Sequence, residues 1–143
     1  MFLGIDIGTS AVKAVVIDVP GDVVATGTAP LSVSRPHPNW SEQTPGDWWE
    51  SVTQAVLQIP DHVRENVLAI SLSGHMHGAT LLGADDRPLR PAILWNDGRS
   101  TLECAALQSA EPDFLARGAN LVMPGFTAPK LEWVRRHEPD VFA

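Results

Sequence analysis

A polar turn near the N-terminus has the residue types that bind a phosphate group. The turn is Asp6-Ile7-Gly8-Thr9-Ser10, and Lys13 follows it. Glycine lets backbone amides approach an anion closely, the two hydroxyls add donors, and a carboxylate can hold the hydrated magnesium that accompanies a nucleotide. The segment lacks the Gly-Lys-Ser/Thr ending of a Walker A loop. A phosphate cradle and an ordinary hairpin with a surface aspartate therefore explain the turn equally well.

A pair of histidines occurs in the segment His75-Met76-His77-Gly78. An extended His-x-His segment would point both imidazoles to one face, as two metal ligands could require, but no third and fourth ligand follows at a recognisable spacing. Two interpretations remain: structural histidines, or a histidine that hydrogen-bonds a substrate hydroxyl while the methionine packs on carbon. A position just after an expected strand favours the substrate-binding role.

A third polar group is Trp95-Asn96-Asp97-Gly98-Arg99. A sugar site needs an apolar platform for C–H faces and several fixed polar groups for hydroxyls, and this segment supplies both. The alternative is that Asn-Asp-Gly forms an ordinary turn and that Trp95 packs in the core. The segment alone does not decide between them.

The first half of the chain is expected to form strands around one helix. Residues 2–7 and 12–19 are β-branched runs separated by a glycine-containing break, which predicts a hairpin, and residues 23–33 add a third strand. Residues 44–59 repeat apolar side chains at helical spacing. The apolar run 67–73 is typical of a buried strand. Strand alternation places Asp6 on the face opposite its apolar neighbours.

The second half is expected to be mixed. Residues 79–82 and 91–95 flank a turn and suggest a hairpin, whereas residues 100–108 and 127–136 look helical, the latter behind Thr127 as N-cap. The whole order predicts an α/β domain whose mixed sheet begins with an antiparallel hairpin and gains a parallel strand after a helical crossover. The actin-like, ribonuclease-H-like ATPase domain has this order.

Composition indicates an ordinary globular chain that acts on small molecules. Of 143 residues, 44% are hydrophobic, and the net charge of -7 opposes binding to nucleic acid or to an anionic membrane. No apolar run approaches the ~20 residues of a spanning helix, and no basic region opens a signal peptide. The single cysteine, Cys104, is expected to be buried, as are Trp48 and Trp133. These features favour a cytoplasmic location.

Six segments together resemble the opening of the FGGY family of carbohydrate kinases, and most of all its xylulokinases. They are Gly4 to Ser10, Ser34 to Pro38, Trp40 to Gln43, Met76 to Leu82, Pro91 to Arg99 and Met123 to Leu131. Each is unspecific alone, but their order matches the family's over nearly the whole chain.

The resemblance implies two actin-like domains around a cleft in which ATP, with Mg²⁺, phosphorylates D-xylulose. It makes Asp6 important for activity beside the phosphates, as a catalytic and magnesium-binding residue. Gly8, Thr9 and Ser10 would face the nucleotide phosphates, with Lys13 as a nearby basic residue. Met76 and His77 would bind the sugar, as would Trp95 and Asp97.

Family members are several times longer. Residues 1–143 are therefore expected to be a truncated N-terminal kinase domain that lacks the C-terminal domain, the catalytic base and the adenine site, and the chain alone is expected to be inactive. An uncovered domain face would favour a homo-oligomer. The alternatives are a kinase for ribulose, gluconate or glycerol, a non-catalytic sugar-binding half-kinase, and an actin-like assembly protein.

Overall fold

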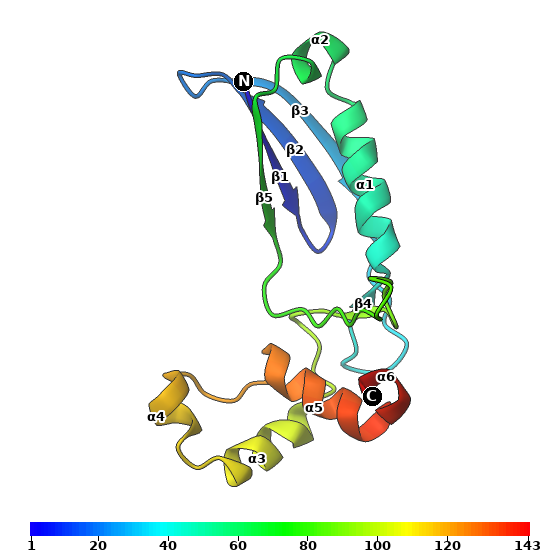
Figure 1. Cartoon of the computed structure of the whole chain (residues 1–143), viewed down its shortest axis with the longest axis vertical. Coiled ribbons are helices and arrows are strands. Elements are labelled where there is room, and N and C mark those ends of the chain that lie inside the picture. The colour runs from blue at the N-terminus through cyan, green and yellow to red at the C-terminus, as the bar shows by residue number, and fades with distance from the viewer. The chain divides into compact units, whose positions relative to one another are not determined.

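The computed structural model of the protein describes all residues from 1 to 143 and divides them into two compact units. The first, here called the sheet unit, consists of Met1–Val33 and Pro45–His75. The second, here called the helical unit, consists of Ser34–Thr44 and Met76–Ala143. Figure 1 draws both and labels most of their helices and strands. No helix is long and apolar enough to cross a membrane.

The sheet unit is built on a four-stranded mixed sheet. Its strands are β1 (Phe2–Ile7), β2 (Ala11–Ile17), β3 (Val23–Pro30) and β5 (Ala69–Gly74), in the order β3-β2-β1-β5. β1 and β3 run antiparallel to β2, whereas β5 runs parallel to β1. The expected hairpin and the parallel strand after the helix are thus both confirmed.

One face of this sheet packs against helix α1 (Pro45–Leu57), as Figure 1 shows. Alternate residues of the strands form the core with Ala55 and Ile59; they are Leu3, Ile5, Val12, Ala14, Val16 and Ala29. The approach is closest at Gly27, where an added Cβ would lie 1.9 Å from the carbonyl oxygen of Ala55. Glycine is required there because any side chain would collide with the backbone of α1. A short helix, α2 (Asp61–Arg64), follows α1.

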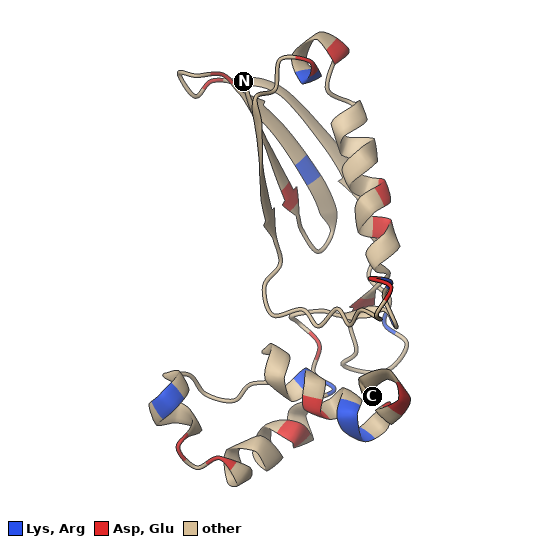
Figure 2. Ribbon diagram, viewed as in Figure 1, with Lys and Arg blue, Asp and Glu red and all other residues tan.

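The expectation of a buried strand at residues 67–73 is wrong for β5. All six of its residues are exposed, including Ile70 at 62% and Leu72 at 71%. β5 lies at the edge of the sheet, where only β1 pairs with it, and helix α1 packs on the other three strands. The side chains of β5 are therefore left uncovered on both faces. β5 carries no charged residue and appears as an unbroken tan strand in Figure 2.

The helical unit combines a small sheet with four helices. The sheet pairs β4 (Glu42–Gln43) with β6 (Ala92–Ile93), and the helices are α3 (Thr101–Ala110), α4 (Phe114–Gly118), α5 (Thr127–His137) and α6 (Pro139–Phe142). Isolated antiparallel bridges join Ala79 to Ile93 and Leu82 to Pro88, so residues 79–93 fold back as expected but form little regular strand. Helix α5 starts at Thr127, and its N-cap is Phe126 rather than Thr127.

The interior of the helical unit mixes aromatic rings with buried charges. The guanidinium of Arg99 lies 3.7 Å from the ring centroid of Trp40 and pairs with Glu42 at 2.8 Å. Trp133 packs edge-on against Trp40, with ring centroids 5.2 Å apart. Trp133 and Cys104 are both 8% exposed, as expected from the sequence, and burial raises the pKa of the Cys104 thiol.

Candidate functional site

Asp6 and Lys13 are neighbours on the open face of the sheet unit. They lie directly opposite each other in the β1–β2 register, and both are exposed. The buried Leu3 and Ile5 occupy the other face, which confirms the expected alternation. A carboxylate and an ammonium group therefore stand side by side near the turn that joins the two strands.

The turn itself is tight because it contains Gly8. The amide of Gly8 donates to the carbonyl of Ala11 at 3.0 Å, and an added Cβ at Gly8 would lie 2.9 Å from that oxygen. Thr9 and Ser10 complete the turn, and the carbonyl of Ser10 accepts a hydrogen bond from the amide of Leu31 at 2.8 Å. One bond closes the turn and the other ties it to Leu31, and together they fix the backbone that carries the two hydroxyls.

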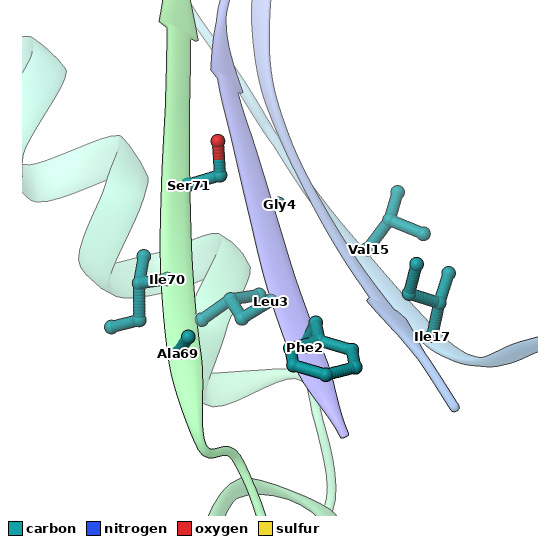
Figure 3. A pocket seen from close by; sticks show the side chains of 8 residues that line it. All are labelled: Phe2, Leu3, Gly4, Val15, Ile17, Ala69, Ile70 and Ser71. Carbon is teal, nitrogen blue, oxygen red and sulfur yellow. The ribbon is translucent and has the colours of Figure 1, made fainter. Parts of the chain in front are cut away.

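The open face is hollowed along its length. A cavity of about 240 Å³ lies against Asp6, Lys13 and Ser73, and a second of about 270 Å³ adjoins it. Figure 3 shows the second cavity, where Phe2, Val15, Ile17, Ala69 and other mostly apolar side chains surround Gly4. The face is therefore polar at the end near the turn and apolar at the other.

His75 lies beside this turn, although no motif in the sequence separates it from His77. Its amide donates to the carbonyl of Ile7 at 3.3 Å, and its ring packs edge-on against Trp48, with centroids 5.4 Å apart. Burial lowers the pKa of His75, while the charge of Asp6 acts in the opposite direction. Its Nε2 has no hydrogen-bond partner. Because β5 runs parallel to β1, the residue that follows β5 lies beside the turn that follows β1. The expected parallel strand could therefore have placed His75 beside that turn.

Met76 and His77 belong to the helical unit, in a bend after β5. His77 has a φ of 61°, in the left-handed region, so the segment is not the extended one that would point two imidazoles to one face. Met76 is 74% exposed and His77 is also exposed. The ring of His77 packs edge-on against Phe126, with centroids 4.7 Å apart.

Trp95 and Asp97 have different environments in the helical unit. Trp95 is half exposed, as a platform for a ligand would be. Asp97 is only 2% exposed, and its carboxylate accepts four hydrogen bonds from the protein. The donors are the amide of Ser41 at 2.6 Å and three nitrogens of Arg99, the amide at 2.9 Å, Nε at 2.9 Å and Nη2 at 2.8 Å. Its lone pairs are thus occupied by protein groups.

Lys130 connects the sugar-side segments, and no motif in the sequence assigns it a role there. Its Nζ donates to the carbonyls of His77 at 2.6 Å and of Gly125 at 2.7 Å. An added Cβ at Gly125 would lie 3.0 Å from the carbonyl oxygen of Trp95. The bend at His77 and the loop that contacts Trp95 are therefore joined through one side chain.

The predicted residues form two groups, Asp6 to Lys13 in the sheet unit and Met76 to Asp97 in the helical unit.

The donor set fits a magnesium ion that is held mainly by water and phosphate. No group of three or more His, Cys, Asp or Glu residues could enclose a metal ion, and Asp6 is the exposed carboxylate beside the turn. Mg²⁺ keeps several waters and is bound through one or two carboxylates together with substrate phosphates. A single carboxylate near a phosphate-binding turn suits that chemistry.

Comparison with known proteins identifies the family to which the chain belongs. Over residues 1–143 the chain matches the FGGY family of carbohydrate kinases, N-terminal domain. It is 53% identical to the xylulose kinase of Escherichia coli over 143 residues, which are 99% of this chain and 30% of that protein. The chain thus spans about a third of that relative's length.

Solved structures of kinases also resemble the chain. A xyloylose kinase from Brucella ovis matches with a TM-score of 0.94 and 51% identity, over 98% of this chain and 30% of that one. The xylulose kinase from Rhodospirillum rubrum matches with a TM-score of 0.91 and 34% identity, again over 98% and 30%. The expected fold class, an α/β actin-like ATPase domain with a mixed sheet, is confirmed. The chain belongs to the FGGY family of carbohydrate kinases, whose N-terminal domain it matches from end to end.

Proposed function

We propose that this chain is the N-terminal part of a xylulokinase, which transfers the γ-phosphoryl group of ATP to D-xylulose and yields D-xylulose 5-phosphate. The observation that carries the proposal is the 53% identity to a xylulose kinase over 99% of the chain. Such a protein would act in pentose metabolism in the cytoplasm. A chain with a net charge of -7 suits a small-molecule substrate better than a nucleic acid.

On the phosphate side, the proposal assigns the sheet unit's polar end to the nucleotide. Asp6 would hold the hydrated Mg²⁺, which neutralises charge on the transferred phosphoryl group when bound. Gly8, Thr9 and Ser10 would face the phosphates, with Lys13 beside Asp6 as a counter-charge. Support comes from the fixed turn and from the opposite placement of Asp6 and Lys13 in the strand register.

On the sugar side, the proposal assigns Met76, His77 and Trp95 to direct contact with D-xylulose. All three are exposed, and they combine an imidazole that hydrogen-bonds hydroxyls with two apolar surfaces for carbon. Asp97 belongs to the same side, but its carboxylate is already bonded to Ser41 and Arg99, so its contribution would be to fix the segment after Trp95.

Phosphoryl transfer would need more than these two groups. A base for the attacking hydroxyl and a grip on adenine would come from a second domain, because the matched relative is about three times as long. We propose that residues 1–143 alone form an N-terminal FGGY domain without measurable kinase activity. The chain alone would also expose apolar surface that favours a homo-oligomer.

A chimera tests the proposal. This chain would replace the matching N-terminal part of the Escherichia coli xylulose kinase, and ADP formation would be followed with D-xylulose, D-ribulose, D-gluconate and glycerol. We expect D-xylulose to give the highest kcat/KM. A higher kcat/KM with another of these substrates would assign the chain to that kinase, and sugar binding without phosphorylation would support a non-catalytic sugar-binding protein.

An Asp6→Asn variant of the chimera tests the phosphate side. Because Asp6 is exposed, the change should leave the fold intact and lower kcat by about 100-fold or more. Asp47→Asn, at an exposed aspartate of α1, is the matched control and should change little. Equal activity of the two variants would remove Asp6 from the proposed machinery.

A further inference from the structure

Lys130 occupies an unusual position for a lysine. Its side chain is completely buried, at 0% exposure, in the first turns of α5. Lysine is almost never fully buried unless it is paired, because an ammonium group loses its hydration there. The two carbonyls of His77 and Gly125 replace water as acceptors. The buried position therefore depends on those two bonds.

The bond to His77 supports a backbone that is unfavourable by itself. A φ of 61° places His77 in the left-handed region, which costs a non-glycine residue free energy and persists only where the surroundings impose it. Two contacts act on this residue: Lys130 Nζ holds its carbonyl, and Phe126 packs against its ring. The first fixes the peptide, and the second fixes the imidazole plane.

The same ammonium group also fixes the loop that ends at Phe126. Its second bond goes to Gly125, whose Cα approaches the carbonyl of Trp95 so closely that an added Cβ would lie 3.0 Å away. Burial lowers the pKa of Lys130, the charge of Asp97 acts in the opposite direction, and the charge of Arg99 adds to the lowering. Lys130 is thus bonded to both the His77 bend and the loop that carries Phe126.

We propose that Lys130 is a positioning residue for sugar binding, which aims the imidazole of His77 by holding that residue's carbonyl. It does not contact the sugar itself. The inference rests on the proposed function, because it deepens the role given there to His77. Its failure is distinguishable: the parent chimera would still phosphorylate D-xylulose if only the role of Lys130 were wrong.

A double-mutant cycle in the chimera tests this role. Lys130→Met removes the two hydrogen bonds while it keeps most of the side chain's volume, and we expect the KM for D-xylulose to rise about tenfold with a smaller change in kcat. In the His77→Ala background the same change should alter KM by less than about twofold, because no imidazole remains to be aimed. Arg135→Met, at an exposed residue of the same helix, is the matched control and should leave KM unchanged.

Two results would overturn the proposal. One is an unchanged KM in Lys130→Met, and the other is the same fold-increase with and without the His77 imidazole, which a purely structural role predicts. If thermal unfolding shows that Lys130→Met does not fold, the cycle is run with Lys130→Arg. That variant keeps the buried charge, but its larger planar guanidinium cannot take the place of the ammonium group between two carbonyls. The same two results for KM would therefore overturn the proposal.

Discussion

The carboxylate of Asp97 and the guanidinium of Arg99 form a two-pronged salt bridge, with Nε to Oδ1 at 2.9 Å and Nη2 to Oδ2 at 2.8 Å. Both side chains are completely buried, at 0% exposure. Because Asp97 and Arg99 are only two positions apart in the chain, their pairing fixes the conformation of the segment after Trp95. Glu42 adds a second negative partner for Arg99 at 2.8 Å.

Removing the charge of Asp97 should therefore destabilise the helical unit. Asp97→Asn leaves the buried guanidinium of Arg99 with one negative partner, and breaking a buried pair costs about 3 kcal/mol. The measurement is urea denaturation of this chain, followed by tryptophan fluorescence. Asp85→Asn, which breaks an exposed pair, is the control and should change the free energy of unfolding by less than about 1 kcal/mol. Similar losses in the two variants would refute the structural role of Asp97.

Gly27 should be essential for packing α1 on the sheet. In Gly27→Ala the new Cβ would lie 1.9 Å from the carbonyl oxygen of Ala55, so α1 must shift, at a cost of about 1–3 kcal/mol. Gly4→Ala is the matched control, because its Cβ would meet nothing closer than 3.9 Å. Thermal unfolding of both variants decides: a Gly27→Ala chain as stable as Gly4→Ala would contradict the close approach.

The edge of the sheet unit should make this chain self-associate. A cavity of about 430 Å³ between α1 and β5 is lined almost wholly by apolar side chains, among them Trp49, Ile70 and Leu72. Sedimentation velocity should show concentration-dependent association that Ile70→Lys weakens, because the charge would have to be desolvated. Val19→Lys, at another exposed apolar residue outside this cavity, should not weaken it. A chain that stays monomeric at high concentration would disprove the expectation.

The burial of Lys130 should appear in the pH dependence of stability. Burial lowers its pKa from 10.5 to about 8. Between these two values the unfolded chain holds more protons on this group than the folded chain does, so its contribution to the free energy of unfolding rises with pH. The cost of burying the charge is fully present below about pH 8 and is relieved toward pH 10.5.

The comparison with Lys130→Met isolates this group. The free energy of unfolding of the parent chain, minus that of the variant, should increase across the same pH window. Urea denaturation at several pH values supplies the difference. A difference that is constant or falls with pH would mean that the lysine is not desolvated as its burial implies.

Much of the sheet unit could be predicted from sequence because its information is local. The alternation along residues 2–7 and 12–17 sets both the hairpin and the face of Asp6, and the structure agrees. The exposure of β5 could not be predicted, because an apolar run has the same composition whether or not another element covers it. The short helices α2, α4 and α6 were missed because four or five residues carry no helical period.

The helical unit's site was less predictable because it depends on contacts distant in sequence. Lys130 meets the carbonyl of His77, 53 residues away, and Asp97 meets the amide of Ser41, 56 residues away. No spacing rule connects such pairs. The left-handed conformation of His77 was equally hidden, because the sequence around it contains no turn signal that requires it at a histidine.

The most direct test of the central claim, that this chain supplies the sugar site of a D-xylulose kinase, is the kcat/KM of the chimera for D-xylulose with and without His77→Ala. We predict that the parent chimera phosphorylates D-xylulose and that the variant loses at least about tenfold in kcat/KM, because a hydrogen bond to a sugar hydroxyl is lost. A parent chimera that is inactive on D-xylulose, or a variant as efficient as the parent, would contradict the claim.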